Sequence, residues 1–528
     1  MKKINELWQR VSSYVRRNPT EIIFGAYFLF VMLVSAYAAS STTIFSKNFI
    51  AILVLYAVFS LVPKIHRGIE KISFEPWLSI SKKEKVFCFF VTSGIAFIVL
   101  FICFLGNYPG VYGPDSFIQY QQSVSGSYSD WHPVWHTLMI FTFPLKLTGG
   151  WIGSIVFFQI IYFSILIGYM AVTIYKYAGP RYTFISIAFI LLSPLTHRII
   201  MYPWKDVAFA IASGFCMLYA INIYFTNGEW GNKFYKMVLL AFMLASATLF
   251  RHNGILFTFF LLIALIFYMP KRKWFLLVCM VGLILILIKV PLYSFFYVQK
   301  APYRVMETMG LPLSVIVNVT KECPDRVNAQ TADFVSEMMQ DQPDWKEFHN
   351  ISGFNTIKFR GVKFDTIENE GITQILKMCF HCFVAAPKQS IMAIYGLTAS
   401  VYSFEYAAVF RVGVRENDFG ITYSGITSIQ KVENYYKSLI EKTPLRFIFL
   451  CVGFSILVMV AFILFKSDFK RIEDWKRLLL CFPIFAYNFG TMLFLSGNSD
   501  VRFFYVSFII CPLVVLIMCG KRESDDGI

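Results

Sequence analysis

The stretch of residues 108–136, "YPGVYGPDSFIQYQQSVSGSYSDWHPVWH", gathers side chains that could do chemistry between two long apolar runs. Its Gly-Pro pair breaks the chain, and proline suits the first turn of a helix. Asp115, Gln119 and Gln122 then recur at i, i+4 and i+7, so they would share one helix face. A carboxylate at a helix start can orient and deprotonate a hydroxyl or hold a divalent cation. The spacing fits equally well an aspartate that only caps the helix.

The second half of this stretch, "SDWHPVWH", offers ligands for several kinds of site. His132 and His136 stand at i, i+4, a spacing that can chelate zinc, and Asp130 could orient one imidazole. A proline follows His132, however, and the glutamate of a metalloprotease HExxH motif is missing. We therefore favour hydrogen bonds from these side chains to a sugar or phosphate, with Trp131 and Trp135 as stacking surfaces, and leave the metal open.

Basic candidates lie in three other short polar motifs, "YPWKD", "RHNG" and "GNSDVR". They supply Lys205, Arg251, His252 and Arg502, which together could surround a phosphate that arginine grips with two hydrogen bonds. For Lys205 alone, a side chain reaching toward the membrane interface explains the pattern better. Asp206, its neighbour, could neutralise it.

The elements that must position these residues are apolar. The chain has 528 residues, of which 57% are hydrophobic and 15% are charged, whereas soluble domains carry about 25% charged residues. The net charge of +16 comes without a basic block interleaved with aromatic residues. We therefore interpret it as a topology signal that also favours anionic membrane lipids, and expect no nucleic-acid partner.

The apolar runs predict an all-α integral membrane protein with about twelve transmembrane helices. We place these spans near residues 22–39, 48–63, 86–106, 151–175, 183–198, 206–225, 236–250, 253–269, 274–290, 446–465, 477–495 and 503–519.

The distribution of Lys and Arg predicts the orientation of the chain. With a cytoplasmic N-terminus, the cytoplasmic segments hold 25 Lys and Arg and the short outer loops hold 6. This bias follows the positive-inside rule and returns the C-terminus to the cytoplasm. All the polar motifs above then lie on the extracytoplasmic face of the cell membrane. Each alone fits an interfacial charge, but five clusters on one face favour a shared cavity.

The same pattern divides the chain into three parts. Residues 1–290 form an N-terminal transmembrane module that carries a catalytic outer loop at 107–150. Residues 291–445 are nearly neutral, with 15 Lys and Arg against 16 Asp and Glu, and predict a partly helical extracytoplasmic segment. Within it, 371–404 reads as helices lying on the membrane surface rather than as an extra span. Residues 446–528 form the C-terminal transmembrane module.

The quoted motifs carry a family resemblance. "NYPGVYGPDSFIQYQQ", "SDWHPVWHTL", "LFRHNGI" and "DVRFFYVSF" are similar to an uncharacterised group of bacterial multi-pass proteins described as glycosyltransferase-like. The arrangement of an acidic early outer loop, many spans and a large outer segment resembles the GT-C class of membrane glycosyltransferases. The topology covers most of the chain, whereas the motifs cover about a tenth of it.

The resemblance implies a polyprenyl-phosphate-linked sugar as donor and a cell-envelope glycan or lipid as acceptor. Asp115 matches the first-loop acid that acts as general base or orients the acceptor, and Arg251 and Arg502 would, by looser analogy, hold the donor phosphate. Serine follows Asp115 where the family commonly has a second acid, and the next outer acid is Asp130. A two-carboxylate site and a divalent cation are therefore open questions.

Two other functions fit the same pattern. A polymerase or ligase of surface polysaccharides would use lipid-linked oligosaccharides in the same geometry. A lipid or solute transporter would also need many spans, but it should show paired half-sequences or polar residues near the bilayer midplane. Here the spans are almost free of charge, with Lys289 at a border, which favours the transferase.

Overall fold

The computed structural model describes residues 13–14, 16–39, 60–77, 80–301, 303–351, 353–404, 413–494, 497 and 499–522. Within these ranges the regular secondary structure is helical, and β-pairing is limited to isolated bridges. The predicted all-α class is therefore confirmed.

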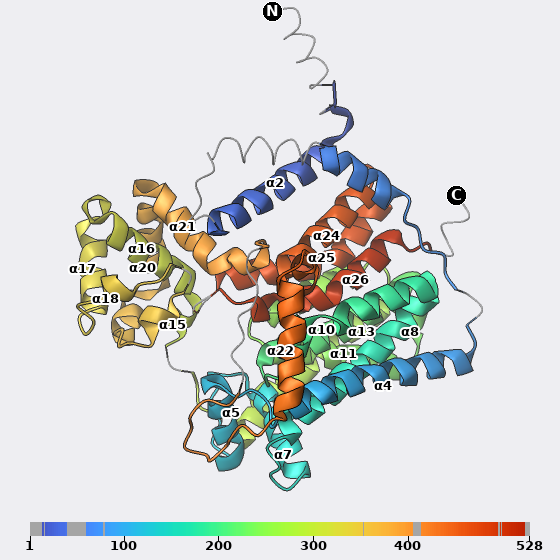
Figure 1. Cartoon of the computed structure of the whole chain (residues 1–528), viewed down its shortest axis with the longest axis horizontal. Coiled ribbons are helices and arrows are strands. Elements are labelled where there is room, and N and C mark those ends of the chain that lie inside the picture. The colour runs from blue at the N-terminus through green and yellow to red at the C-terminus, as the bar shows by residue number, and fades with distance from the viewer. Residues whose placement is uncertain are drawn as a thin grey trace, which may run out of the picture.

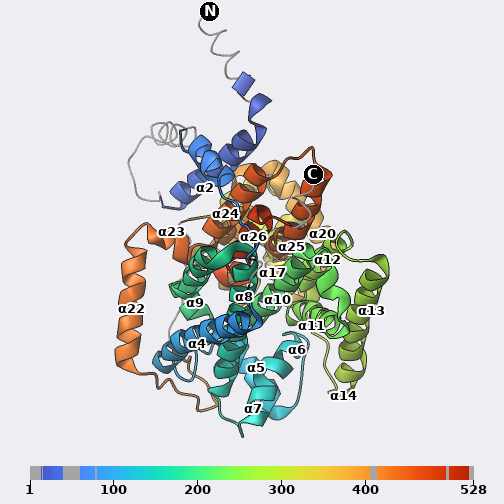
Figure 2. The same ribbon diagram turned by 90° about the vertical axis from the view of Figure 1, so that its right-hand side faces the viewer.

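One large hydrophobic cluster holds the main bundle together. Its centre is formed by α10 (Lys205–Phe225) and α26 (Tyr505–Cys519), which are buried along almost their whole lengths. Figures 1 and 2 show the helices that surround this pair. Those that pack directly on it are α8 (Ser154–Leu191), α11 (Phe234–Phe250), α12 (Gly254–Leu265), α24 (Val452–Lys466) and α25 (Ile472–Leu493). In an outer position, α4 (Lys82–Gly106) packs on α8, and α13 (Lys271–Leu287) packs on α11.

Among the described residues, five helices are long and apolar enough to cross a membrane. They are α4, α8, α10, the continuous run Lys271–Phe295 and the run Val501–Cys519. The shorter apolar helices are Pro19–Ser35 within α2 (Pro19–Ala39), α11, α12 and α24. All of them coincide with predicted spans, whereas most of the predicted span 48–63 lies outside the described residues. The chain therefore contains helices of membrane-spanning length, and the total of twelve stays a prediction.

Two predicted spans form the single long element α8. The expected loop at 176–182 is a kink at Gly179, whose φ of 76° lies in the left-handed region that glycine tolerates, followed by Pro180. The chain then continues through α9 (Pro194–Ile199) to α10.

The predicted catalytic loop 107–150 is largely helical. It contains α5 (Pro114–Ser125), α6 (Val134–His136), the π-helix η1 (Thr137–Thr142) and α7 (Phe143–Leu147). α5 packs on η1, and α6 packs on α11. This compact group lies beyond the Gly106 end of α4. Because its helices pack on one another and on the bundle, its side chains are held in place.

A second hydrophobic cluster organises the helices between residues 304 and 398, which we call the satellite unit. Figure 1 shows it to one side of the main bundle. Its helices are α15 (Arg304–Thr308), α16 (Gly310–Glu322), α17 (Ala329–Met338), α18 (Trp345–Phe348), α19 (Asn355–Lys358), α20 (Phe364–Ala385, kinked at Gly371) and α21 (Pro387–Thr398).

The satellite unit is tied to the last loop of the main bundle. The backbone N–H of Phe354 donates to the carbonyl of Gly497 over 2.9 Å. The backbone N–H of Ser400, just past α21, donates to the Ser499 hydroxyl over 3.3 Å. Trp131, from the α5–α6 connection, also packs against the satellite cluster. The unit therefore contacts both polar loops of the bundle.

Helix α22 (Thr427–Glu441) lies steeply inclined to α4, as both views show (Figures 1 and 2). It is fixed by buried polar contacts: the Asn107 amide donates to Glu433 over 2.9 Å, and Arg198 donates to Asn434. Arg198 thus helps to hold α22 in place. The next helix, α23 (Leu445–Leu450), leads into α24.

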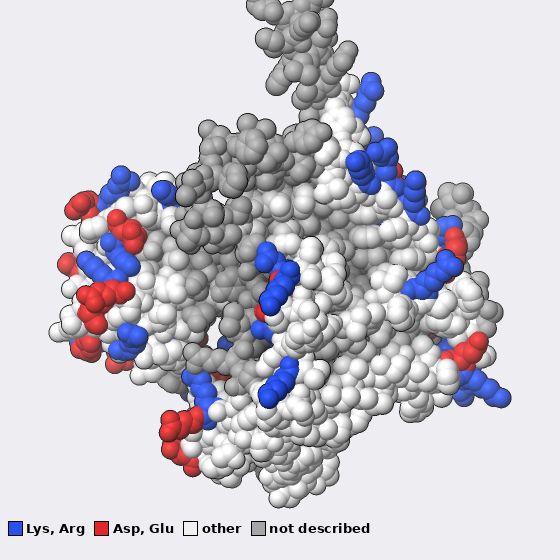
Figure 3. Space-filling view, in the orientation of Figure 1, with Lys and Arg blue, Asp and Glu red and all other residues white. Residues whose placement is uncertain are grey.

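Charged side chains on the face in Figure 3 gather on opposite sides of the molecule. One group covers the satellite unit and the neighbouring loops, and the other covers the far edge of the bundle. The surface between them is mostly uncharged, apart from charges over α22. Apolar residues of α4 are exposed in the described structure, including Phe87 at 70% and Phe90 at 67%. Such a surface is typical of a helix that faces lipid.

Candidate active site

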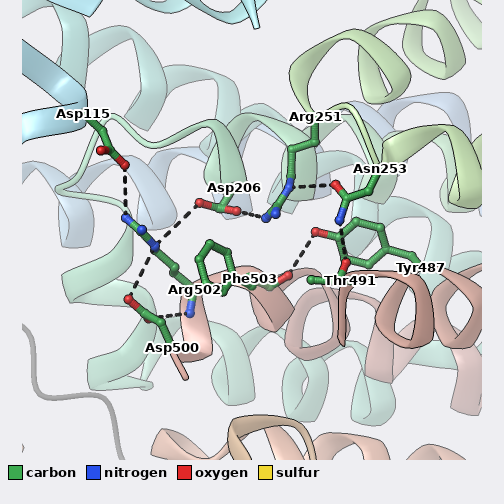
Figure 4. Close-up of polar contacts among 9 residues, drawn as sticks. All are labelled: Asp115, Asp206, Arg251, Asn253, Tyr487, Thr491, Asp500, Arg502 and Phe503. Carbon is green, nitrogen blue, oxygen red and sulfur yellow. Dashed lines mark hydrogen bonds and ion pairs between the residues drawn. The ribbon is translucent and has the colours of Figure 1, made fainter. Parts of the chain in front are cut away.

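Helix α5 begins as predicted, with Pro114 in its first turn and Gly113 at the N-cap. No side chain caps this end of the helix, so Asp115 is not a cap. Its carboxylate, whose side chain is 43% exposed, lies 3.8 Å from Nη1 of Arg502 (Figure 4). The carboxylate therefore meets a cation from the other end of the sequence.

The two glutamines of the same helix face are buried in the loop. The Gln119 side-chain oxygen lies 2.5 Å from Nδ1 of His136 and accepts a hydrogen bond from the Thr137 hydroxyl over 3.3 Å. Burial lowers the pKa of His136 well below its usual value, so the ring is neutral and donates to Gln119. Gln119 and His136 thus join α5 to η1, and Gln122 is buried beside them. The predicted sugar-binding role has no support in these contacts.

Arg502 lies at the centre of a group of carboxylates. Its Nε atom is 3.4 Å from Asp500 and 4.0 Å from Asp206, in addition to the contact with Asp115. Asp500 also caps the 3₁₀ turn η6 (Val501–Phe504) by accepting from the Arg502 backbone N–H over 2.9 Å. The guanidinium lies 4.5 Å from the centre of the Trp204 ring, a cation–π distance.

Arg251 lies deeper in the bundle than Arg502, and its guanidinium already has partners within the protein. It forms an ion pair with Asp206, and its Nε donates to Asn253 over 3.1 Å. Asn253 in turn donates to Thr491 over 2.8 Å (Figure 4). Gly254 permits this tight turn, since an added Cβ would lie 2.2 Å from the Ala247 carbonyl. Arg251 is therefore placed to orient Asp206 rather than to receive a phosphate.

Lys205 and His132 are the groups near Asp115 that lack partners in the described structure. Lys205 is the first residue of α10, where the positive end of the helix dipole adds to its charge, and it forms no ion pair with a described residue. The His132 ring is 3% exposed, and neither of its nitrogens has a hydrogen-bond partner among the described residues. Burial and the nearby Lys205 lower the pKa of His132 to about 3. The imidazole is neutral and can donate one hydrogen bond.

The surrounding charges keep Asp115 ionised. Burial raises the pKa of its carboxyl group, but the positive charges of Arg502 and Lys205 outweigh that effect and leave the pKa below its ordinary value. An ionised carboxylate that retains solvent access can accept a proton from a hydroxyl.

Asp130 and His252 form a neighbouring group. The Asp130 carboxylate is 3.2 Å from Lys289 Nζ and accepts from the Tyr293 hydroxyl over 2.9 Å. His252 forms a hydrogen bond with the Asp130 backbone, and burial lowers the pKa of its ring. Asp130 is therefore engaged with the end of the α13 run, and it does not orient His132 or His136.

A zinc site does not emerge from these positions. His136 points to Gln119, whereas His132 lies among the groups around Lys205. Among the residues described, no group of three or more His, Cys, Asp or Glu side chains is close enough to hold a metal ion. Arg502 occupies the space between the three aspartates.

The satellite unit adds two residues that the sequence reasoning missed. Lys358 is 6% exposed and pairs with Glu307, and its Nζ lies 5.8 Å from the centre of the Trp131 ring. Its charge also helps to lower the pKa of Asp115. Both residues lie in a nearly neutral polar segment, so no local spacing marks them.

Comparisons with known proteins do not identify the chain: no protein-family model, no curated protein and no solved structure matches it.

Proposed function

We propose that the chain is a membrane glycosyltransferase that moves a sugar from a polyprenyl phosphate to an acceptor on the extracytoplasmic face of the cell membrane. The observation that carries this proposal is that an ionised carboxylate, Asp115, lies 3.8 Å from Arg502 and near two groups without partners among the described residues, Lys205 and His132. These groups gather where several apolar helices end. A base beside an anion-binding group suits the displacement of a phosphate leaving group.

The donor phosphate would bind to Lys205, His132 and Arg502. Lys205 offers its charge at a helix N-terminus, a favourable place for an anion. The buried, unsatisfied imidazole of His132 gains a hydrogen-bond acceptor, and Arg502 can contribute N–H donors from the same side. The polyprenyl tail would lie along the apolar exterior of the bundle. These donors stabilise the negative charge that grows on the phosphate as its bond to the sugar breaks.

Asp115 would act on the acceptor. Its carboxylate takes the proton of the acceptor hydroxyl while that oxygen forms a bond to C1 of the sugar. The bond from C1 to the phosphate oxygen breaks, and the polyprenyl phosphate leaves with the electron pair. Because base and leaving group flank C1, one displacement inverts the anomeric configuration.

The proposal includes the topology: about twelve spans, both termini in the cytoplasm, and the satellite unit outside. The separation of charged side chains onto two sides of the face in Figure 3 supports a membrane-spanning bundle with the satellite unit on one side of the bilayer. The uncharged surface between the two groups is broad, as a bilayer requires.

The test uses purified protein in liposomes supplied with radiolabelled undecaprenyl-phosphate hexoses and a solubilised cell-envelope acceptor fraction. Wild-type protein should transfer label. Asp115→Asn should lower the rate at least about 100-fold, as expected for the loss of a general base, while its affinity for undecaprenyl phosphate stays within about twofold. Asp333→Asn, an exposed carboxylate of the satellite unit, is the matched control and should transfer normally.

Two results would contradict the proposal. One is full transfer by a folded Asp115→Asn protein. The other is a wild-type protein that transfers no label but carries sugar or lipid across the liposome membrane at a rate that Asp115→Asn does not change, because that behaviour is a transporter's.

A further inference from the structure

The two side chains of the Lys358–Glu307 ion pair differ in their exposure to solvent. The Lys358 side chain is 6% exposed, whereas that of Glu307 is 35% exposed. Lys358 is therefore the buried anchor, and the carboxylate of Glu307 keeps a face open to solvent. A buried lysine needs such a partner, because an unpaired charge in that position would be costly.

Several contacts hold this pair at the edge of the candidate site. Lys358 lies over the ring of Trp131, the neighbour of His132. The backbone N–H of Met306, which precedes Glu307, donates to Glu368 of α20 over 3.1 Å. Lys205 is close enough to interact electrostatically with both Asp115 and Glu307. The positive charge of Lys205 thus acts on one carboxylate from the bundle and on one from the satellite unit, without forming an ion pair with either.

The negative charge of Glu307 indicates which part of a substrate its carboxylate would bind. A phosphate would be repelled by the Glu307 carboxylate and attracted by Lys205 and Arg502. Neutral sugar hydroxyl groups are instead attracted to the Glu307 carboxylate, because a carboxylate can accept hydrogen bonds from two hydroxyl groups at once. The partly exposed Trp131 ring, which lies near Lys358, offers a flat apolar surface on which sugar rings commonly stack.

We propose that Glu307 is the second carboxylate of the site, that it binds hydroxyl groups of the acceptor sugar, and that Lys358 is its positioning residue. This inference rests on the proposed transferase function and assigns the acceptor side of the site to the satellite unit. Asp115 then deprotonates the attacking hydroxyl, while Glu307 holds its neighbours.

The experiment separates acceptor binding from donor binding. With the undecaprenyl-phosphate hexose that the wild type uses, transfer to a panel of n-octyl hexosides gives kcat and the acceptor KM. Binding of undecaprenyl phosphate alone gives the donor-side affinity. Glu307→Gln should raise the acceptor KM about tenfold, change kcat less than threefold and leave undecaprenyl phosphate binding unchanged.

Lys358→Met should raise the acceptor KM in the same way, and Lys358→Arg, which keeps the ion pair, should restore it at least in part. Glu322→Gln, on the surface of the same unit and paired with Lys321, is the control and should match the wild type. A Glu307→Gln protein with an unchanged acceptor KM would overturn the inference while leaving the transferase intact. So would weaker undecaprenyl phosphate binding with an unchanged acceptor KM. If the wild type binds undecaprenyl phosphate but transfers no sugar to any acceptor, this result contradicts the proposed transferase function and therefore also the inference about Glu307.

Discussion

Replacing Arg502 by methionine should shift the pH dependence of transfer as well as slow it. Arg502 lowers the pKa of Asp115, against the effect of burial, which raises it. The base is ionised, and therefore active, at pH values above this pKa. When the guanidinium is removed, the pKa rises, so the rate should begin to fall at a higher pH as the solution is acidified.

The size of the shift follows from the geometry. Two unit charges at about 4 Å interact by about 1 kcal/mol in water and about 4 kcal/mol in a medium with the effective dielectric of a protein surface. The Asp115 side chain is 43% exposed and its contact with Arg502 measures 3.8 Å, so solvent screening favours the lower end of that range. We therefore expect Arg502→Met to remove about 1 kcal/mol of stabilisation from the ionised carboxylate, which raises its pKa and moves the acid limb to higher pH.

The assay is the pH profile of kcat/KM for transfer, between pH 4 and 8, with folding checked by thermal melting in detergent. Arg502→Met should also lower kcat/KM at neutral pH about 100-fold, because the leaving phosphate loses a donor. Arg502→Lys should keep the acid limb near that of the wild type but recover only part of the rate, since lysine lacks the planar fork. Arg326→Gln, on the surface of the satellite unit, is the control.

One result would refute this reasoning. If Arg502→Met loses activity but its acid limb stays at the wild-type pH, then Asp115 is not the group whose titration limits transfer, and Arg502 acts only on the donor.

Three further predictions concern the supports of the site. Asp206→Asn should destabilise the protein by about 3–5 kcal/mol, because it leaves the charge of Arg251 buried and unpaired; a normal melting temperature would contradict the ion pair. His132→Phe should weaken undecaprenyl phosphate binding about tenfold, the loss of one hydrogen bond to a charged group, and unchanged binding would remove His132 from the phosphate site. Gln119→Leu should cost about 1–3 kcal/mol by leaving the His136 ring unsatisfied, seen as faster proteolysis within residues 107–150; equal proteolysis would show that another contact holds the loop.

The sequence predicts the helices well because their apolar runs are long. α10 and α26 are recognised by composition alone, and the helix that carries Asp115 is marked by its Gly-Pro start. Local patterns of this kind depend on residues within one or two turns of each other, so a single sequence suffices to find them.

The partners of the charged residues could not be predicted in the same way. The pairing of Arg251 with Asp206, and not of Asp206 with Lys205, depends on how α10 and α11 meet. The position of Lys358 depends on the folding of a separate hydrophobic cluster. Spacing also could not reveal the partner of Gln119: the shared helix face exists, and packing turns the Gln119 side chain toward His136. Such outcomes are set by tertiary contacts far apart in the sequence.

The hydrogen bonds from Phe354 to Gly497 and from Ser400 to Ser499 join the satellite unit to the loop that carries Arg502. If that unit receives the acceptor and Arg502 binds the donor, then these contacts connect the two binding sites. Linkage requires any strengthening to be mutual: a factor by which the acceptor tightens undecaprenyl phosphate binding is the factor by which undecaprenyl phosphate tightens acceptor binding. Through such coupling, these two hydrogen bonds would disfavour transfer of the sugar to water before the acceptor has bound.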